Sequence, residues 1–108
     1  MRKETRELYR KACEKWDQLQ FIVAIEECSE LIKAICKAWR NPSGATADSL
    51  VEEIVDVKIM AEQLEIVFNC EKAAGRIRRK KLRRLKKLLK PKTFMEGIDQ
   101  IDDALKDG

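Results

Sequence analysis

The chain has 108 residues, 44% of them hydrophobic and 39% charged, with a net charge of +4. Only four residues are glycine and two are proline, a composition that argues against disordered and β-rich proteins. No apolar run approaches the roughly 20 residues needed to cross a bilayer, so we expect no membrane partner. The first residues, MRKETRELYR, lack the apolar core of a signal peptide, and we expect a cytoplasmic protein.

Hydrophobic spacing predicts four helices, at about residues 3–16, 19–39, 49–68 and 71–89. The turn formers of NPSG, residues 41–44, separate the second helix from the third. Ser49 and Glu52 have capping-box spacing at the expected start of the third helix, and Pro91 ends the fourth. We therefore predict an all-α, four-helix bundle-like domain over residues 1–92. We expect residues 93–108 to be a C-terminal tail, because their apolar spacing predicts a short amphipathic helix there.

Two of these helices carry acidic pairs whose members are three residues apart. On the second helix, Glu27 and Glu30 border a broad apolar stripe that we interpret as core: Phe21, Ile22, Ile25, Cys28, Ser29, Ile32, Ile35, Cys36 and Trp39. Lys33 and Lys37 project to the opposite side, as solvated charges do. On the third helix, Glu53 and Asp56 lie in a narrow arc between two apolar stripes. Burying ionised carboxylates costs several kcal/mol unless a cation compensates.

If these two helices pack together, four carboxylates converge and predict a metal site. The chain has no histidine and no CxxC pair, which argues against zinc and against His-based catalysis. A set of carboxylate oxygens suits Mg²⁺, with Mn²⁺ as a substitute. The alternative is that these acids are ordinary surface charges paired with Lys and Arg, because a single ExxE pattern is common on helices.

The paired acids and their surroundings resemble the MazG-like family of all-α nucleoside triphosphate pyrophosphohydrolases. The family pattern EExxE, spacer, ExxD stands here as EECSE, residues 26–30, and EIVD, residues 53–56, with 22 residues between them. The flanking segments 18–35 and 50–64, and KKLRRL at 80–85, extend the resemblance. It implies that Glu27, Glu30, Glu53 and Asp56 are catalytic and hold Mg²⁺. It also implies homodimers or homotetramers.

The fourth helix is strongly basic, since residues 72–92 hold twelve basic side chains and no acidic one. Arg78 and Lys81 project inside its apolar arc, and Arg84 lies at the edge of that arc. The resemblance implies that basic residues of this region contact the triphosphate, so we expect Lys81, Arg84 and then Arg78 to bind substrate. The competing interpretation is that these basic residues pair with the acids, Glu27 or Asp56, in a purely structural bundle. Near the acids, Gln20 and Trp16 are candidates for the nucleotide pocket.

The resemblance therefore implies a cytoplasmic hydrolase that converts a (d)NTP and water to a (d)NMP and diphosphate. A phosphoribosyl-ATP pyrophosphohydrolase is less expected, because Val-Lys-Ile-Met follows Asp56 where that group usually carries a Tyr-His step. The alternative from another class is a noncatalytic helical module that binds nucleic acid through the basic fourth helix. That helix lacks interleaved aromatic residues, which argues against nucleic acid as a partner.

Overall fold

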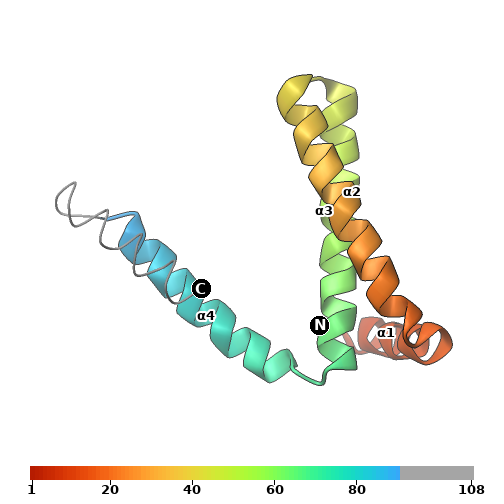
Figure 1. Ribbon diagram of the computed structural model, residues 1–108. Helices are drawn as coiled ribbons and strands as arrows, with labels where there is room; N and C mark the ends of the chain where they lie inside the picture. Colours follow the sequence, from red (N-terminus) through yellow and green to blue (C-terminus); the bar gives the residue numbers. More distant parts are fainter. Residues whose placement is uncertain (91–108) are drawn as a thin grey trace. The chain divides into compact units, whose positions relative to one another are not determined.

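The computed structural model describes residues 1–90, which contain four α-helices and no strand (Figure 1). These helices are α1 (Lys3–Trp16), α2 (Leu19–Arg40), α3 (Gly44–Val67) and α4 (Glu71–Leu88). The predicted all-α class is confirmed. The expected tail helix and the domain boundary between residues 92 and 93 lie outside the described residues.

The start of α3 differs from the sequence-based expectation. Ser43, not Ser49, caps the helix: its side-chain oxygen accepts a hydrogen bond from the Thr46 backbone N–H at 3.1 Å. The Ser43 backbone N–H in turn donates to Thr46 Oγ1 at 2.9 Å, which completes a capping box. The prediction from Ser49 was wrong because the earlier serine satisfies the free N–H groups of the first turn, and Ser49 lies inside α3.

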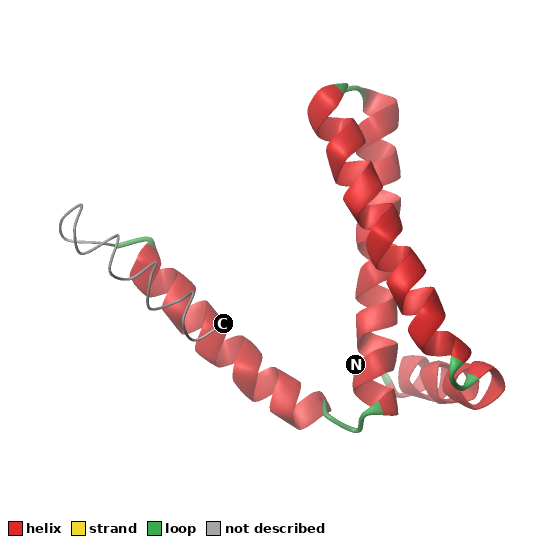
Figure 2. Cartoon of the chain, in the orientation of Figure 1, coloured by secondary structure: helices red, strands yellow, loops and turns green. Residues whose placement is uncertain are grey.

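The described chain divides into two compact units, Met1–Cys70 and a second unit that begins at Glu71. In the first unit, α2 and α3 form a long antiparallel hairpin, and α1 packs at the end of the hairpin away from the 41–44 turn (Figures 1 and 2). Tyr9 fastens α1 to α3, because its hydroxyl donates to Glu62 Oε2 at 2.9 Å and its side chain is 7% exposed. At the joint before α4, Asn69 has φ 51°, a conformation that Asn tolerates better than most residues.

Small and polar side chains, rather than the large apolar ones, fill the contact between α2 and α3. On α2 the less exposed positions recur at helical spacing: Gln20, Ala24, Glu27, Leu31, Ala34 and Ala38. They face Leu50, Glu53, Val57 and Met60 of α3. The stripe that we interpreted as core lies outside this contact, with Ile32 62% exposed and Trp39 86% exposed. That interpretation was wrong for the single chain, because the alanine side of α2 lets the two helices approach closely.

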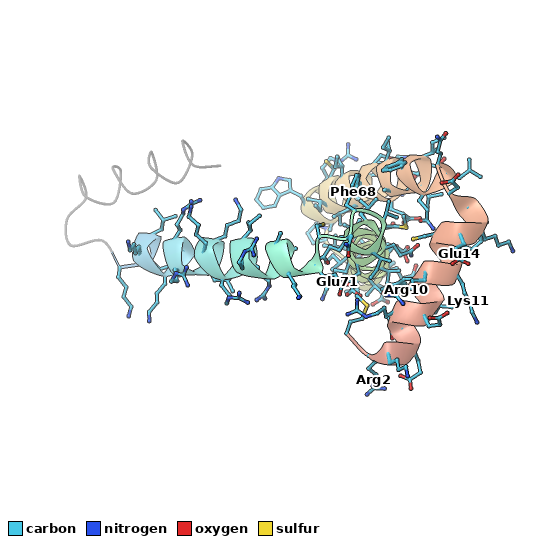
Figure 3. The ribbon with its side chains drawn as sticks, turned by 90° about the horizontal axis from the view of Figure 1, so that it is seen from below. Arg2, Arg10, Lys11, Glu14, Phe68 and Glu71 are labelled. Atoms are coloured by element: carbon cyan, nitrogen blue, oxygen red, sulfur yellow. The ribbon has the colours of Figure 1, made fainter. Side chains whose placement is uncertain are left out.

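The hairpin consequently has two unlike sides. We call one side the apolar flank, and its exposed members are Phe21, Ile25, Ile32, Ile35, Trp39, Ile54 and Phe68. The rings of Phe21 and Phe68 meet across the two helices on this flank, with centroids 5.8 Å apart (Figure 3 labels Phe68). We call the other side the polar flank, defined by Glu30, Lys33, Lys37, Arg40 and Ser49. The exposed apolar flank leaves a surface that a second chain can cover.

The second unit contains α4, a strongly amphipathic helix. One uninterrupted arc of its surface is basic and exposed: Lys72, Arg76, Arg79, Lys80, Arg83, Lys86 and Lys87. Ile77, Leu82, Leu85 and Leu88 lie on the other side of the helix. Within residues 1–90, no helix combines the length and the apolar character that a membrane crossing requires.

Candidate metal centre

Three of the four predicted carboxylates come together at the α2–α3 contact. Glu27, Glu53 and Asp56 each offer an oxygen, and these oxygens lie within 4.8 Å of one another. Glu27 belongs to the side of α2 that faces α3, Glu53 belongs to the opposing side of α3, and Asp56 follows Glu53 by three residues at the edge of the contact. The packing of two helices, each with an acid at the contact, therefore builds the cluster.

Glu30 lies beside this group without joining it at that distance. Its side chain is exposed on the polar flank, and it lines a pocket together with Glu53. Its negative charge also contributes to the raised pKa of Glu53. Glu30 is thus an electrostatic neighbour of the cluster, one helical turn beyond Glu27.

The cluster is electrostatically unfavourable as it stands. Loss of hydration raises the pKa of Glu27 above its usual range, and the charges of Asp56 and Glu53 raise it further. The pKa of Glu53 is raised in the same way, by loss of hydration first and then by the charges of Asp56 and Glu30. In addition, the Oε2 atom of Glu53 is enclosed and has no hydrogen-bond partner. An orphaned oxygen among like charges is the environment that a bound cation would relieve.

The donor set fits a hard divalent cation. It consists of carboxylate oxygens alone, which suit Mg²⁺ and Mn²⁺ and suit zinc or copper poorly. The exposed side chain of Asp56 leaves the cluster open to solvent on one side, as an ion that keeps some of its waters requires. The residues present therefore fit the ion that the sequence predicts.

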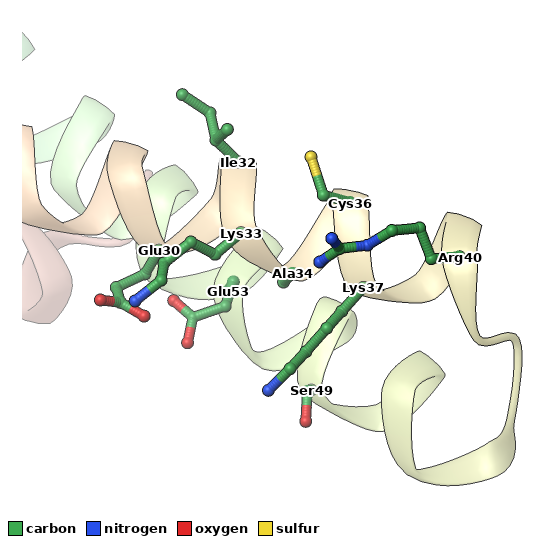
Figure 4. A pocket seen from close by; sticks show the side chains of 9 residues that line it. All are labelled: Glu30, Ile32, Lys33, Ala34, Cys36, Lys37, Arg40, Ser49 and Glu53. Carbon is green, nitrogen blue, oxygen red and sulfur yellow. The ribbon is translucent and has the colours of Figure 1, made fainter.

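A pocket of about 480 Å³ adjoins the cluster on the polar flank and extends over the outer surface of α2, where Ile32 of the apolar flank and Cys36 also line it (Figure 4). Glu30 and Glu53 lie at one end of it and Arg40 at the other, with Lys37 and Ser49 between them (Figure 4). The cations of this pocket were not predicted as site residues, because Lys33 and Lys37 fall on the solvated side of α2 in the sequence pattern. Their spacing of three and seven residues from Glu30 was the signal that placed them beside the acids.

The other predicted substrate-binding residues have unlike surroundings. Gln20 is 3% exposed, faces α3, and its Nε2 atom has no hydrogen-bond partner. Trp16 is 48% exposed at the end of α1, where the Lys15 amino group lies 5.3 Å from its ring centroid. Arg78, Lys81 and Arg84 belong to α4 in the second unit. Their contact with a substrate, like that of Gln20 and Trp16, stays a prediction.

None of the family models, curated proteins or solved structures compared with the chain matches it. The resemblance to the MazG-like family therefore depends on the motifs alone.

Proposed function

We propose that this chain is a Mg²⁺-dependent nucleoside triphosphate pyrophosphohydrolase with a MazG-like fold. The observation that supports the proposal is the convergence of Glu27, Glu53 and Asp56 at the α2–α3 contact. Helical spacing and the EExxE and ExxD motifs point to the same three residues. Acids that act only as surface charges do not need to converge at a helix contact. Nor do they need to enclose an oxygen that lacks a hydrogen-bond partner, as Glu53 does here.

Glu27, Glu53 and Asp56 would hold the ion, and Glu30 would join them or act beside them. When bound, Mg²⁺ supplies Lewis-acid polarisation of phosphate oxygens and activation of water. We assign to Glu30 the role of accepting the proton of the attacking water, because it lies next to the cluster and outside the group of three. Cationic side chains would balance the charge on the phosphates and on the departing diphosphate.

We further propose that the functional particle is a homodimer or a homotetramer in which a second copy covers the apolar flank. The large apolar side chains of this flank are exposed in the single chain, with Trp39 at 86% and Ile25 at 69%. Exposed apolar surface of this extent, continuous across two helices, is typical of an interaction site. A second copy presents the same surface, so the contact would be self-complementary about a twofold axis.

The activity is tested by measuring diphosphate release from a panel of NTPs and dNTPs with Mg²⁺, with Mn²⁺ and with a chelator. We expect release only with a divalent ion. In Glu53→Gln the rate should fall by about 10²–10³-fold, the loss typical of removing one preorganised electrostatic group. Glu65→Gln, on the same helix and outside the cluster, is the matched control and should keep wild-type activity. Equal rates in Glu53→Gln and wild type would refute the site assignment.

A second candidate function is noncatalytic binding of nucleic acid by α4. The uninterrupted basic and exposed arc of this helix favours it, because phosphate backbones attract such arcs without sequence preference. Salt-sensitive binding of DNA or RNA, lost when Arg79 and Arg83 are changed to Gln, together with no hydrolysis of any nucleotide, would favour this candidate. Hydrolysis that depends on Glu53 would exclude it as the main function.

A further inference from the structure

A row of cations lies beside the carboxylates on the polar flank. Lys33, Lys37 and Arg40 all line the pocket to which Glu30 and Glu53 contribute (Figure 4). At 1.5 Å per residue, the row from 33 to 40 extends over about 10 Å of α2. A row of this length, opening from a carboxylate cluster, matches a chain of linked phosphates better than a single phosphate.

The contribution of this row to the stability of α2 is of mixed sign, because Lys37 and Arg40 lie in its last turn, where cations interact favourably with the helix dipole. All three side chains are exposed. Lys33 and Lys37 are four residues apart, a spacing at which like charges on a helix repel each other. Across the pocket, the Ser49 hydroxyl of α3 adds a further hydrogen-bond donor. The pocket therefore gathers donors that an anionic ligand would satisfy.

The charge of the pocket depends on the state of the carboxylates. Without a metal ion, Glu30 and Glu53 offset most of the positive charge of the three cations. Once a divalent ion neutralises the carboxylates, the lining becomes strongly positive and attracts a polyanion. Metal and polyanion would then bind together, each strengthening the binding of the other.

We propose that Lys33, Lys37 and Arg40 form the phosphate subsite, which binds the polyphosphate chain of the nucleotide beside the metal centre. This inference depends on the proposed function for the presence of the ion. It assigns the contact to α2, within the unit Met1–Cys70 that also holds the carboxylates. The sequence-based expectation assigned that role to Arg78, Lys81 and Arg84 of α4. The Arg40 guanidinium supplies paired N–H donors, and the two lysines supply point charges.

The test measures the binding of inorganic tripolyphosphate by calorimetry, with and without Mg²⁺, so that no hydrolysis is needed. We expect Mg²⁺-dependent binding by wild type, about tenfold weaker binding in Lys37→Gln and in Arg40→Gln, and about a hundredfold loss in the double variant. Lys58→Gln, an exposed cation of the same hairpin that does not line the pocket, should bind as wild type does. Circular dichroism melts verify that each variant is folded.

Three outcomes would overturn the inference: no binding of tripolyphosphate by wild type in Mg²⁺, unchanged binding in the double variant, or a loss confined to Lys81→Gln and Arg84→Gln. Parallel assays of diphosphate release separate its failure from that of the proposed function. Hydrolysis with unchanged binding in the α2 variants refutes the subsite alone. Binding that is lost in the α2 variants, without hydrolysis of any nucleotide by wild type, supports the subsite and refutes the pyrophosphohydrolase.

Discussion

Self-association through the apolar flank is the prediction whose magnitude the structure sets most directly. Ile32 lies in the middle of this flank and is 62% exposed in the single chain. Ile32→Ala removes three carbon atoms, each worth about 0.8 kcal/mol when fully buried. If a second copy buries the part that is now exposed, the loss is about 1.5 kcal/mol per chain. A twofold contact doubles this to about 3 kcal/mol, which weakens the dimer by roughly a hundredfold.

Sedimentation equilibrium of wild type and Ile32→Ala over a range of concentrations measures this change. Leu8→Ala is the matched control, because Leu8 is 64% exposed but belongs to α1 and lies outside the apolar flank. We expect the dissociation constant of the control to equal that of wild type. A wild-type protein that stays monomeric at high micromolar concentration, or an Ile32→Ala variant that dimerises as tightly as wild type, would refute the reasoning.

Three further predictions concern the carboxylates and the start of α3. The raised pKa values of Glu27 and Glu53 mean that the folded chain binds protons more tightly than the unfolded chain. Their stabilising contribution is therefore complete below the ordinary pKa of 4.5 and is lost as the pH rises through the raised values. Thermal melts in a chelator should show wild type losing stability relative to Glu27→Gln as the pH rises from 4.5 to neutrality, and a parallel pH dependence would contradict this. At neutral pH, millimolar Mg²⁺ should raise the melting temperature of wild type and leave that of Glu27→Gln nearly unchanged, because the ion binds only the intact cluster. Loss of the helix cap in Ser43→Ala should lower the free energy of unfolding by about 1 kcal/mol, measured in urea, with Ser49→Ala close to wild type.

Helical spacing and turn residues were enough to predict the four helices, apart from the start of α3, and the meeting of three of the four acids. The turn formers at 41–44 join the second and third helices by a short connection, so these helices run antiparallel and the acids of one come near the acids of the other. Spacing does not tell which side of a helix faces a neighbour in the same chain and which faces another molecule. The large side chains of Ile25 and Ile32 suggested the internal contact, whereas Ala24 and Ala34 form it.

The pocket cations were missed for a related reason. Lys33 and Lys37 are exposed, as their spacing predicted, but exposure does not distinguish a solvated charge from one that lines an open pocket. The two lysines line one pocket only because α3 brings Glu53 and Ser49 to the same side of the hairpin. A local sequence pattern predicts which residues share one side of a helix. It does not predict which residues of a second helix come to lie beside them.

Because Glu27 lies on the surface that joins α2 to α3, the same surface holds the hairpin together and, under the proposed function, binds the metal ion. A leucine at position 27 would fill the α2–α3 contact and make the hairpin more stable, because an apolar side chain needs no counter-ion. Under the proposed function, such a chain would also hold no Mg²⁺ and would lose its activity. On that proposal, selection for activity keeps this protein less stable than its own architecture permits.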